Sequence, residues 1–556
     1  MNFDNKKIMP RFFVVIVLMS LGGLYILGNA AYLMFVESEY WTQVSRKLVK
    51  ENVPIPAKRG NILSADGQIM ASSLPEYKIY MDYVASDKNP ETAKELQAWR
   101  DSVLIADLDS ISQGLSKIFP DKTAGYFKKR LKKGKKLRRR NWQIYGRRIS
   151  YIQYKECKKL PLFRESPFKG GFYAEEFNQR KKPYGSLATR TLGALYASKD
   201  SARYGLELSY DSILRGKEGV SHRAKVRNKW LSLVDAPPVD GNDIETTIDV
   251  YIQYELENQL EDTYKDNGAD ERACGIVMDV NTGAILAMAT YPTFDLNDPY
   301  TLDQYSKEKL AASGLEEGSD AYRKSYYEML YNMWSNKAVT VLYEPGSTFK
   351  AVTATIGFEE NVLKESDTFY CSGSYKVDGY PRPISCHKHE GHGLVDFVHG
   401  LQQSCNPTMM MLGERIGAEK FYKNFRAFGY TEKTGIDLPA ESSSIVSDEK
   451  NFNGVSLAVY TFGQTFKVTP IQQIDAIAAI ANGGNLVTPH LISRILDDDG
   501  NTVYEYKTDV KRQVASENSC ERVTTILEAG VSGDGGAKNA YVRGYKVAAK
   551  TGTSEK

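Results

Sequence analysis

Cysteine is scarce in this sequence, and neither sign of charge is in clear excess. The 556 residues include 6 cysteines, which are too few for a disulfide scaffold in a chain of this length. Lysine and arginine number 72 against 69 acidic residues, and the net charge of +3 therefore indicates no class of partner. The length predicts about three to four domain-sized units.

Long apolar runs are also rare, and the one that could cross a bilayer, residues 12–36, lies near the N-terminus. It is longer than the apolar part of a signal peptide and no convincing cleavage site follows it, so we interpret it as an uncleaved anchor. Basic residues precede the run and acidic residues follow it: Lys6, Lys7, Arg11, Glu37 and Glu39. The positive-inside rule then predicts a cytoplasmic tail, residues 1–11, and an external location for everything after the anchor.

Positive charge is concentrated in one place, residues 128–140, which read KKRLKKGKKLRRR. In a cytosolic protein this run would suggest nucleic acid, but the predicted topology argues against that partner. The surrounding segment, from Asp101 to Lys159, is charged and has a mostly helical pattern. We favour a solvated helical arm. Anionic lipid headgroups or a cell-wall polymer are the alternative ligands.

Two of the cysteines, Cys371 and Cys386, bracket a loop rich in glycine, tyrosine and proline. In an oxidising compartment they could close this loop as a disulfide. The same loop carries three histidines, which makes zinc an alternative, although the spacing matches no common structural zinc site. These histidines are His387, His389 and His392. Three other cysteines are predicted to be small buried residues, namely Cys157, Cys274 and Cys520.

The stretch YEPGSTFKAVTATIGF, from Tyr343 to Phe358, contains a Ser-x-x-Lys motif. Turn-forming residues precede Ser347, and apolar residues at roughly helical spacing follow it, which predicts that Ser347 lies in the first turn of a helix. Lys350 would share a face of that helix with Ser347, and the unpaired N–H groups of the turn would face an anion formed there. Ser347 is therefore a candidate nucleophile.

Two further motifs lie downstream, and together with them the short Ser-x-x-Lys motif, which is weak alone, becomes a specific signal. Ser404-Cys405-Asn406 follows a helix-like run, and Lys550-Thr551-Gly552-Thr553 ends a strand-like run from Tyr545 to Ala549. The three motifs together form the set found in penicillin-binding proteins and serine β-lactamases.

The remaining pattern predicts an α+β fold with helices packed on a largely antiparallel sheet. Asp66-Gly67 and Asn281-Thr282-Gly283 are the predicted hairpin turns, the second of which joins strands at 273–280 and 284–290. Asp243 to Asp249 is a predicted strand that leads into an amphipathic helix. Other helices are predicted at 347–359, 394–403 and 471–482.

With these motifs the chain resembles the class B penicillin-binding proteins, which are membrane-anchored peptidoglycan D,D-transpeptidases, and among them the septal, cell-division type most closely. The resemblance covers nearly the whole chain. It includes RGNIL with DGQIMA, residues 180–193, GLELSYDSILRGKEG, VMDVNTGAILAMATYPTFDLN and GQTFKVTPIQQIDAIAAIANGG. It implies an anchor at 12–36, a non-catalytic pedestal of the dimerisation type at 37–240, and a transpeptidase domain at 241–556.

The resemblance also implies a role for each motif residue. Ser347 would be the acylated nucleophile, Lys350 its base, and Ser404 the relay of a proton to the leaving D-alanine. Asn406 would orient the donor peptide and Lys350. Lys550, Thr551, Gly552 and Thr553 would bind the substrate carboxylate, and the N–H groups of Ser347 and Thr553 would form the oxyanion hole. A lysine acts as base only when neutral, and burial beside Lys550 would lower its pKa in that direction. Neither a metal nor an organic cofactor is implied.

The sequence departs from the family pattern at two points. It stops soon after the Lys-Thr-Gly motif, where the family continues with further strands and a helix, so we expect a truncated transpeptidase domain. Ala549 also stands where glycine is usual.

The residues leave other functions open. These are a D,D-carboxypeptidase, a penicillin-binding sensor and a catalytically idle division scaffold. A β-lactamase is disfavoured, because no dedicated deacylating carboxylate is evident near the second motif. The partners implied by the resemblance are stem peptides ending in D-Ala-D-Ala, β-lactams, a membrane glycosyltransferase and small bitopic division proteins. The implied location is the bacterial cytoplasmic membrane, with the catalytic domain on its outer side and no nucleic-acid partner.

Overall fold

The computed structural model describes residues 5–38, 49–85, 90–196, 201–226, 229–269 and 271–554. Part of the predicted tail, residues 1–4, and the last two residues lie outside these ranges. The chain forms two compact units. The smaller unit comprises residues 1–57, 77–176 and 217–239, and the larger comprises residues 58–76, 177–216 and 240–556. Two segments that were predicted to belong to the pedestal, residues 58–76 and 177–216, are therefore part of the compact unit that contains the three motifs.

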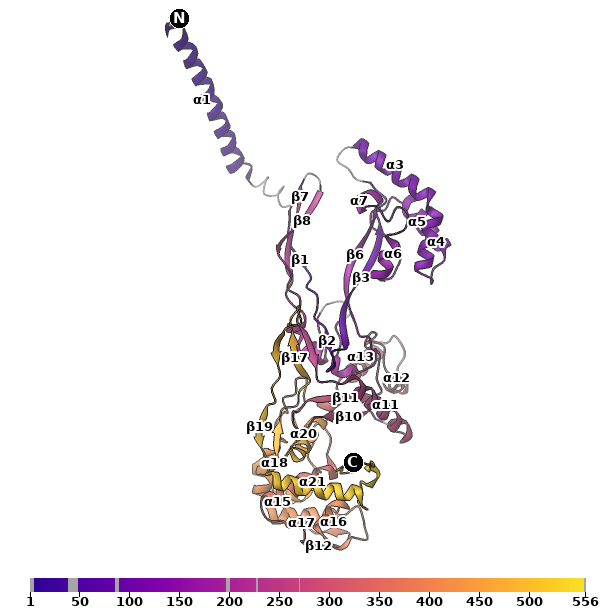
Figure 1. Ribbon diagram of the computed structural model, residues 1–556, viewed down its shortest axis with the longest axis vertical. Helices are drawn as coiled ribbons and strands as arrows, with labels where there is room; N and C mark the ends of the chain where they lie inside the picture. Colours follow the sequence, from indigo (N-terminus) through magenta and orange to yellow (C-terminus); the bar gives the residue numbers. More distant parts are fainter. Residues whose placement is uncertain are drawn as a thin grey trace. The chain divides into compact units, whose positions relative to one another are not determined.

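The predicted anchor is a single helix, α1 (Asn5–Phe35; Figure 1). Its segment Phe13–Phe35 is long and apolar enough to cross a membrane. Large apolar side chains are exposed all around it, among them Leu24 and Phe35. A helix that is apolar on every face is suited to lipid rather than to water.

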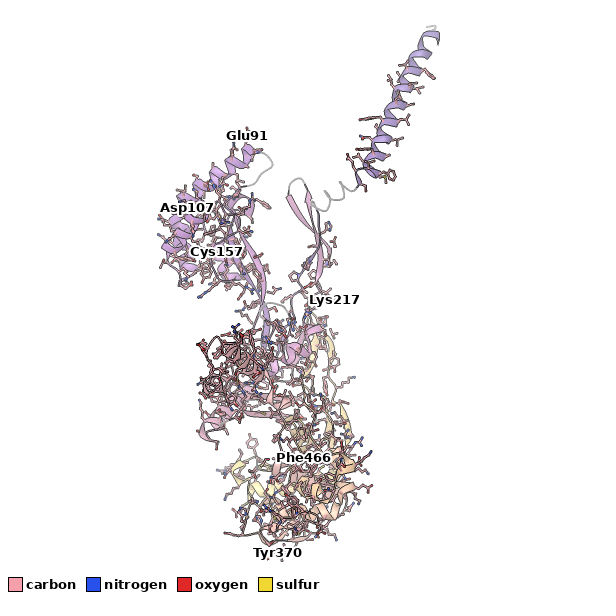
Figure 2. The ribbon with its side chains drawn as sticks, turned by 180° about the vertical axis from the view of Figure 1, so that it is seen from behind. Glu91, Asp107, Cys157, Lys217, Tyr370 and Phe466 are labelled. Atoms are coloured by element: carbon pink, nitrogen blue, oxygen red, sulfur yellow. The ribbon has the colours of Figure 1, made fainter. Side chains whose placement is uncertain are left out.

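The smaller unit contains a three-stranded antiparallel sheet in the order β1 (Val49–Ile55), β7 (Gly219–Val226), β8 (Lys229–Ala236). It also contains a helical part that covers the end of β3 (Ile69–Met81). The other elements of that part are α3 (Pro90–Ala106), α4 (Leu108–Ile118), α5 (Ala124–Lys136), β4 (Trp142–Gln143), β5 (Ile149–Ser150), α6 (Tyr151–Cys157), α7 (Pro167–Gly170) and β6 (Phe172–Lys181). Cys157, labelled in Figure 2, is buried in this core.

The helical pattern predicted for residues 101–159 is confirmed, and the basic run lies on and just beyond α5. Phe127 and Leu131 face the core, while carboxylates of the neighbouring helices pair with the basic side chains. Arg138 pairs with Asp101 at 2.8 Å, and Lys128 pairs with Asp109. The positive charge of this run is thus partly neutralised within its own unit.

The larger unit contains a sheet with the order β18 (Thr502–Glu505), β17 (Ile492–Leu496), β9 (Asp243–Thr246), β2 (Ile62–Leu63), β3. The pairs are antiparallel except β2 with β9. β2 and β3 form the predicted hairpin, with Gly67 at φ +77° in its turn. A positive φ is what a tight turn requires and what glycine supplies without steric cost.

The second predicted hairpin is also present, as β10 (Ala273–Met278) paired with β11 (Ile285–Tyr291). The amphipathic helix α11 (Val250–Asp266) packs on it, and its N-terminus is capped by the Asp249 carboxylate. An N-cap of this kind satisfies N–H groups that the first helical turn leaves without partners.

The rest of the larger unit is mainly helical, and α15 (Lys350–Glu359) packs there against both α17 (Asn406–Ile416) and α21 (Glu517–Ser532; Figure 1). Phe349, Phe425, Tyr430 and Phe466 form an aromatic centre, and Phe466 is labelled in Figure 2. The helices are α8 (Thr189–Leu192), α9 (Gly205–Ser209), α10 (Asp211–Leu214), α12 (Gln304–Ala312), α13 (Asp320–Trp334), α14 (Lys337–Thr340), η1 (Gly346–Phe349), α15 (Lys350–Glu359), α16 (Phe397–Gln402), α17 (Asn406–Ile416), α18 (Ala418–Ala427), η2 (Glu449–Asn451), α19 (Gly454–Tyr460), α20 (Pro470–Ala481), α21 (Glu517–Ser532) and η3 (Lys538–Ala540). The short strands are β12 (Thr368–Cys371), β13 (Ser374–Tyr375), β14 (Ile384–Ser385), β15 (Gly393–Asp396), β16 (Asn485–Val487) and β19 (Val510–Gln513).

The strand predicted for Tyr545 to Ala549 is wrong: these residues form no strand. The composition of the segment is strand-like, but a strand also requires a neighbour that exchanges backbone hydrogen bonds with it. None of the described strands pairs with this segment.

A buried cluster of charges joins two of the sequence landmarks in the larger unit. The Glu207 carboxylate accepts hydrogen bonds from Arg59 at 2.8 Å and from Arg180 at 2.7 Å. Arg59 also donates to Asp211 at 2.6 Å. Burial favours the neutral form of Glu207, but Arg180, Lys182 and Arg59 outweigh it, so the pKa of Glu207 is lowered. The GLELSYD segment is thereby fixed to the RGN segment.

Candidate active site

Ser347 lies at the start of a helix, as predicted. The turn η1 contains it, and α15 continues from Lys350. Gly346 has φ +55°, and its N–H donates to the Gly463 carbonyl at 2.9 Å. A Cβ on Gly463 would lie 2.1 Å from the Gly346 carbonyl oxygen, so only glycine fits there. The half-buried Ser347 is thus held on a turn that a second backbone segment supports.

Lys350 is fully buried, and its amine reaches the second motif. The amine donates to the Ser404 carbonyl at 2.6 Å, to the Ser404 hydroxyl at 3.1 Å and to Asn406 Oδ1 at 2.6 Å. Within the described residues it makes no hydrogen bond to Ser347, although the two share the start of the helix. Burial, and then the nearby Lys550 ammonium, lower the pKa of Lys350 to about 7. A substantial fraction of Lys350 is therefore neutral at neutral pH.

The second motif lies in the short connection between α16 and α17. Ser404 has φ +59°, a left-handed conformation that costs energy for a non-glycine residue. Asn406 begins α17, and its side-chain amide donates to the Ser385 carbonyl at 3.2 Å. The strained turn directs the Ser404 hydroxyl and carbonyl toward Lys350.

The third motif passes over the turn that carries Ser347. A Cβ on Gly552 would lie 2.8 Å from the Thr348 methyl carbon, and one on Gly346 would lie 2.4 Å from the Thr553 carbonyl oxygen. The Lys550 amine donates to the Ser404 hydroxyl at 2.9 Å, and burial lowers its pKa to about 8. Thr551 and Thr553 are exposed, so a ligand could reach them.

The structure therefore gathers all eight predicted residues at one place: Ser347, Lys350, Ser404, Asn406, Lys550, Thr551, Gly552 and Thr553. The Ser404 hydroxyl contacts both lysine amines, and no carboxylate forms an ion pair with either lysine in the described part of the chain. Chemically, a neutral Lys350 can accept a proton, Ser404 can pass one on, and a charged Lys550 beside two exposed threonines can hold a carboxylate. These individual roles stay predictions.

A cluster that the sequence reasoning did not assemble lies directly behind the second motif. It comprises Cys371, Cys386, His392 and Cys405. All six cysteines are free thiols, so the Cys371–Cys386 disulfide, which the sequence left open as one alternative, is not formed. Cys405 was considered only as the middle residue of the Ser-Cys-Asn motif. The signal available in the sequence was its sulfur-containing side chain between two polar residues.

Comparison with known sequences identifies two family regions. Residues 273–556 match the family described as penicillin binding protein transpeptidase domain. Residues 54–246 match the penicillin-binding protein dimerisation domain. The first region contains every predicted site residue.

Similar proteins support the same relationship. The chain is 30% identical over 564 residues to the stage V sporulation protein D of Bacillus subtilis (strain 168), with all of this chain and 78% of that protein covered. It is 26% identical to a peptidoglycan D,D-transpeptidase FtsI homolog of Mesostigma viride, covering 68% of this chain and 62% of the homolog. The crystal structure of penicillin binding protein 2X from Streptococcus thermophilus shares the fold, with a TM-score of 0.67, 24% identity, and 86% of this chain and 66% of that chain covered.

Proposed function

The chain belongs to the penicillin-binding protein transpeptidase family, and from this premise we propose that it is a penicillin-sensitive serine D,D-transpeptidase that cross-links peptidoglycan stem peptides. One observation carries the proposal. The Ser404 hydroxyl is within hydrogen-bond distance of both the Lys350 and the Lys550 amine, at 3.1 and 2.9 Å, beside the turn that presents Ser347. The Ser404 hydroxyl thus connects a buried candidate base to a second lysine, next to the turn that carries the half-buried candidate nucleophile.

The proposed reaction begins with a stem peptide that ends in D-Ala-D-Ala. Neutral Lys350 takes the proton of the Ser347 hydroxyl, whose oxygen attacks the carbonyl carbon of the penultimate residue. N–H groups of Ser347 and Thr553 stabilise the oxyanion. The C–N bond then breaks, and a proton passed through Ser404 leaves with D-alanine. An amine of a second stem peptide attacks the ester, which forms the cross-link and frees Ser347.

Mass spectrometry after incubation with a penicillin tests the acylation step. We expect one adduct on the peptide that contains Ser347, and none in Ser347→Ala. Ser532→Ala, which removes an exposed hydroxyl at the end of α21, is the matched control and should label fully. Wild-type protein that stays folded and unlabelled would favour the idle scaffold instead.

The fate of the acyl group separates the transpeptidase from the carboxypeptidase. The protein is incubated with a D-Ala-D-Ala stem peptide and an acceptor amine, and the products are resolved by chromatography. We expect the cross-linked product, with released D-alanine in equal amount. Hydrolysed peptide alone would identify a carboxypeptidase, and rapid loss of the penicillin adduct would identify a β-lactamase.

We further propose that α1 anchors the protein in the bacterial cytoplasmic membrane with its N-terminus inside and all residues after 36 outside. The basic residues before the apolar segment Phe13–Phe35 and the acidic residues after it support this orientation. A reporter that is active only outside the membrane, fused after residue 38 or before residue 1, distinguishes the two orientations. Activity of the second fusion alone would contradict the proposal.

For the cellular role we propose septal cell-wall synthesis, together with a membrane glycosyltransferase and small bitopic division proteins. The family relationship and the likeness to an FtsI homolog support it. Depletion should give filaments, and a fluorescent fusion should concentrate at division sites. An even distribution along the cell wall, with rounded cells on depletion, would indicate elongation instead.

A further inference from the structure

Three fully buried cysteines and one histidine converge from separate segments of the larger unit. Cys371 ends β12, Cys386 follows β14, His392 precedes β15, and Cys405 lies between α16 and α17. The three cysteines are at most 1% exposed. The sulfur atoms and one ring nitrogen of His392 all lie within 4.8 Å of one another. Four such donor atoms rarely meet without a common partner, because free thiols gain little from one another.

The donor set and its spacing match tetrahedral zinc. Zn–S bonds of about 2.3 Å and Zn–N bonds of about 2.0–2.1 Å give sulfur–nitrogen edges of about 3.6 Å. The Cys386 sulfur lies 3.7 Å from Nδ1 of His392. We propose that Cys371, Cys386, His392 and Cys405 form a Cys₃His zinc site that fixes the Ser404–Asn406 turn. Four protein ligands leave no open position, so the role of the site is structural.

The two loops that carry Cys371 and Cys386 are built against each other through their backbones. The Cys386 N–H donates to the Gly373 carbonyl at 2.8 Å. Gly373 and Gly391 have φ of +95° and +82°. A Cβ on Gly391 would lie 2.3 Å from the Cys371 carbonyl oxygen, and one on Gly373 would lie 1.9 Å from the His389 carbonyl oxygen. The four ligands are thus brought together by the fold itself, and the proposed site does not require a loop to rearrange.

The site is coupled to the second motif from two sides. Cys405 stands between Ser404 and Asn406, so a metal bond to its sulfur would restrain both neighbours. Asn406 in turn donates to the carbonyl of Ser385, the residue before Cys386. Both connections act on the groups that hold the Lys350 amine. We therefore infer that zinc positions Ser404 and Asn406 while touching no substrate; only this positioning role rests on the proposed function.

His387 and His389 provide the comparison needed to test the ligand set. Nδ1 of His387 also lies 3.7 Å from the Cys386 sulfur, but His387 is outside the four-atom cluster. His389 is exposed and belongs to no such cluster among the residues that the structure describes. His389→Ala is therefore the matched control for His392→Ala, since both remove one imidazole from the same loop.

The first experiment measures metal content in the full chain, purified in detergent with a reducing agent and without a metal-affinity step. Inductively coupled plasma mass spectrometry should find about one zinc per chain. Zinc should fall below one fifth of this value in His392→Ala and in Cys371→Ser, and remain in His389→Ala. Wild-type protein without zinc, or with a Cys371–Cys386 disulfide in the peptide map, overturns the proposal, whether or not the variants fold. Full zinc in both ligand variants overturns it as well.

The second experiment tests positioning. Removal of zinc by a chelator should lower the rate of penicillin acylation about 10- to 100-fold, and added zinc, but not magnesium, should restore it. An unchanged rate overturns the positioning role. Ser347→Ala separates the two proposals, because it should keep its zinc although it cannot be acylated. Zinc without acylation in the wild type would refute the transpeptidase and leave the metal site in place.

Discussion

The buried cluster around Glu207 and the active site around Lys350 both place charge in the interior, but they differ in how that charge is balanced. Glu207 is surrounded by cations, and its pKa is lowered in spite of its burial. Lys350 has another lysine beside it, its hydrogen-bond partners are neutral oxygen atoms, and its pKa falls to about 7. A buried charge that has oppositely charged partners stays ionised and holds segments of the chain together. An uncompensated lysine gives up its proton, which is what a base requires.

Replacement of Lys350 should have the largest effect. Lys350→Met removes the base and leaves the Ser404 and Asn406 oxygens without their donor, so we expect the acylation rate constant to fall about 10²- to 10⁴-fold. Stopped-flow measurement with a reporter β-lactam gives this rate constant. Lys337→Met is the matched control, because burial also lowers the pKa of Lys337 to about 8 away from the site. Equal losses in both variants would contradict the assignment of the base.

Removal of the Glu207 carboxylate should destabilise the buried cluster of charges around it. Glu207→Gln leaves Arg180 buried without its counter-charge and Arg59 with Asp211 alone, and we expect the free energy of unfolding to fall by about 3–5 kcal/mol. Denaturant titration followed by tryptophan fluorescence measures this loss. The protein that remains folded should be acylated at the wild-type rate. A loss below about 1 kcal/mol would show that the cluster does not bear on stability.

The pH dependence of acylation tests directly whether the charge of Lys550 lowers the pKa of Lys350. Since Lys350 must be neutral, the rate should rise with pH, about tenfold per unit well below pH 7, and level off above it. Lys550→Gln removes the neighbouring charge, so the pKa of Lys350 should rise and the acidic limb should move to higher pH, on the order of one unit. Rates at saturating β-lactam separate this shift from weaker binding. If the acidic limb does not move, burial alone accounts for the lowered pKa of Lys350.

The smallest effect is expected at the solvent-exposed edge of the cluster around Glu207. Arg215 pairs with Asp211 at 2.6 Å, but its side chain is 46% exposed. Arg215→Met should change the free energy of unfolding by roughly 0–1 kcal/mol, because a solvated pair gains little over water. The denaturant titration used for Glu207→Gln provides the measurement. A loss as large as that of Glu207→Gln would mean that exposure does not separate strong from weak pairs in this cluster.

The sequence was sufficient where function depends on local pattern. The turn before Ser347, the hairpins at Asp66-Gly67 and 281–283, and the α11 helix follow from turn residues and apolar spacing, and all are present. The three motifs also predicted which residues meet. The lowered pKa of Lys350 was predictable in direction, because burial and a second lysine act in the same sense.

The sequence was insufficient where a property depends on partners distant in the chain. Residues 545–549 have strand-like composition, but no described strand pairs with them. Cys371 and Cys386 were noticed as a pair, whereas Cys405 joins them only through the packing of α16 and α17 against β12 and β14. The Lys350 amine likewise binds the Ser404 turn rather than the neighbouring serine, and spacing along one helix could not reveal this.

We expect the crossing of the third motif over the Ser347 turn to determine when during folding the protein becomes reactive. Lys550 meets Ser404 across 146 positions of the chain, and Ser554 meets Glu344 across 210. Contacts of such separation form late, because the intervening chain must first lose its entropy. We therefore expect that a nascent or partly folded molecule can contain Ser347, Lys350 and the helix α15 and still not react with a β-lactam. Acylation would then report completed folding, and we expect an inhibitor of this kind to act only on molecules that have already matured.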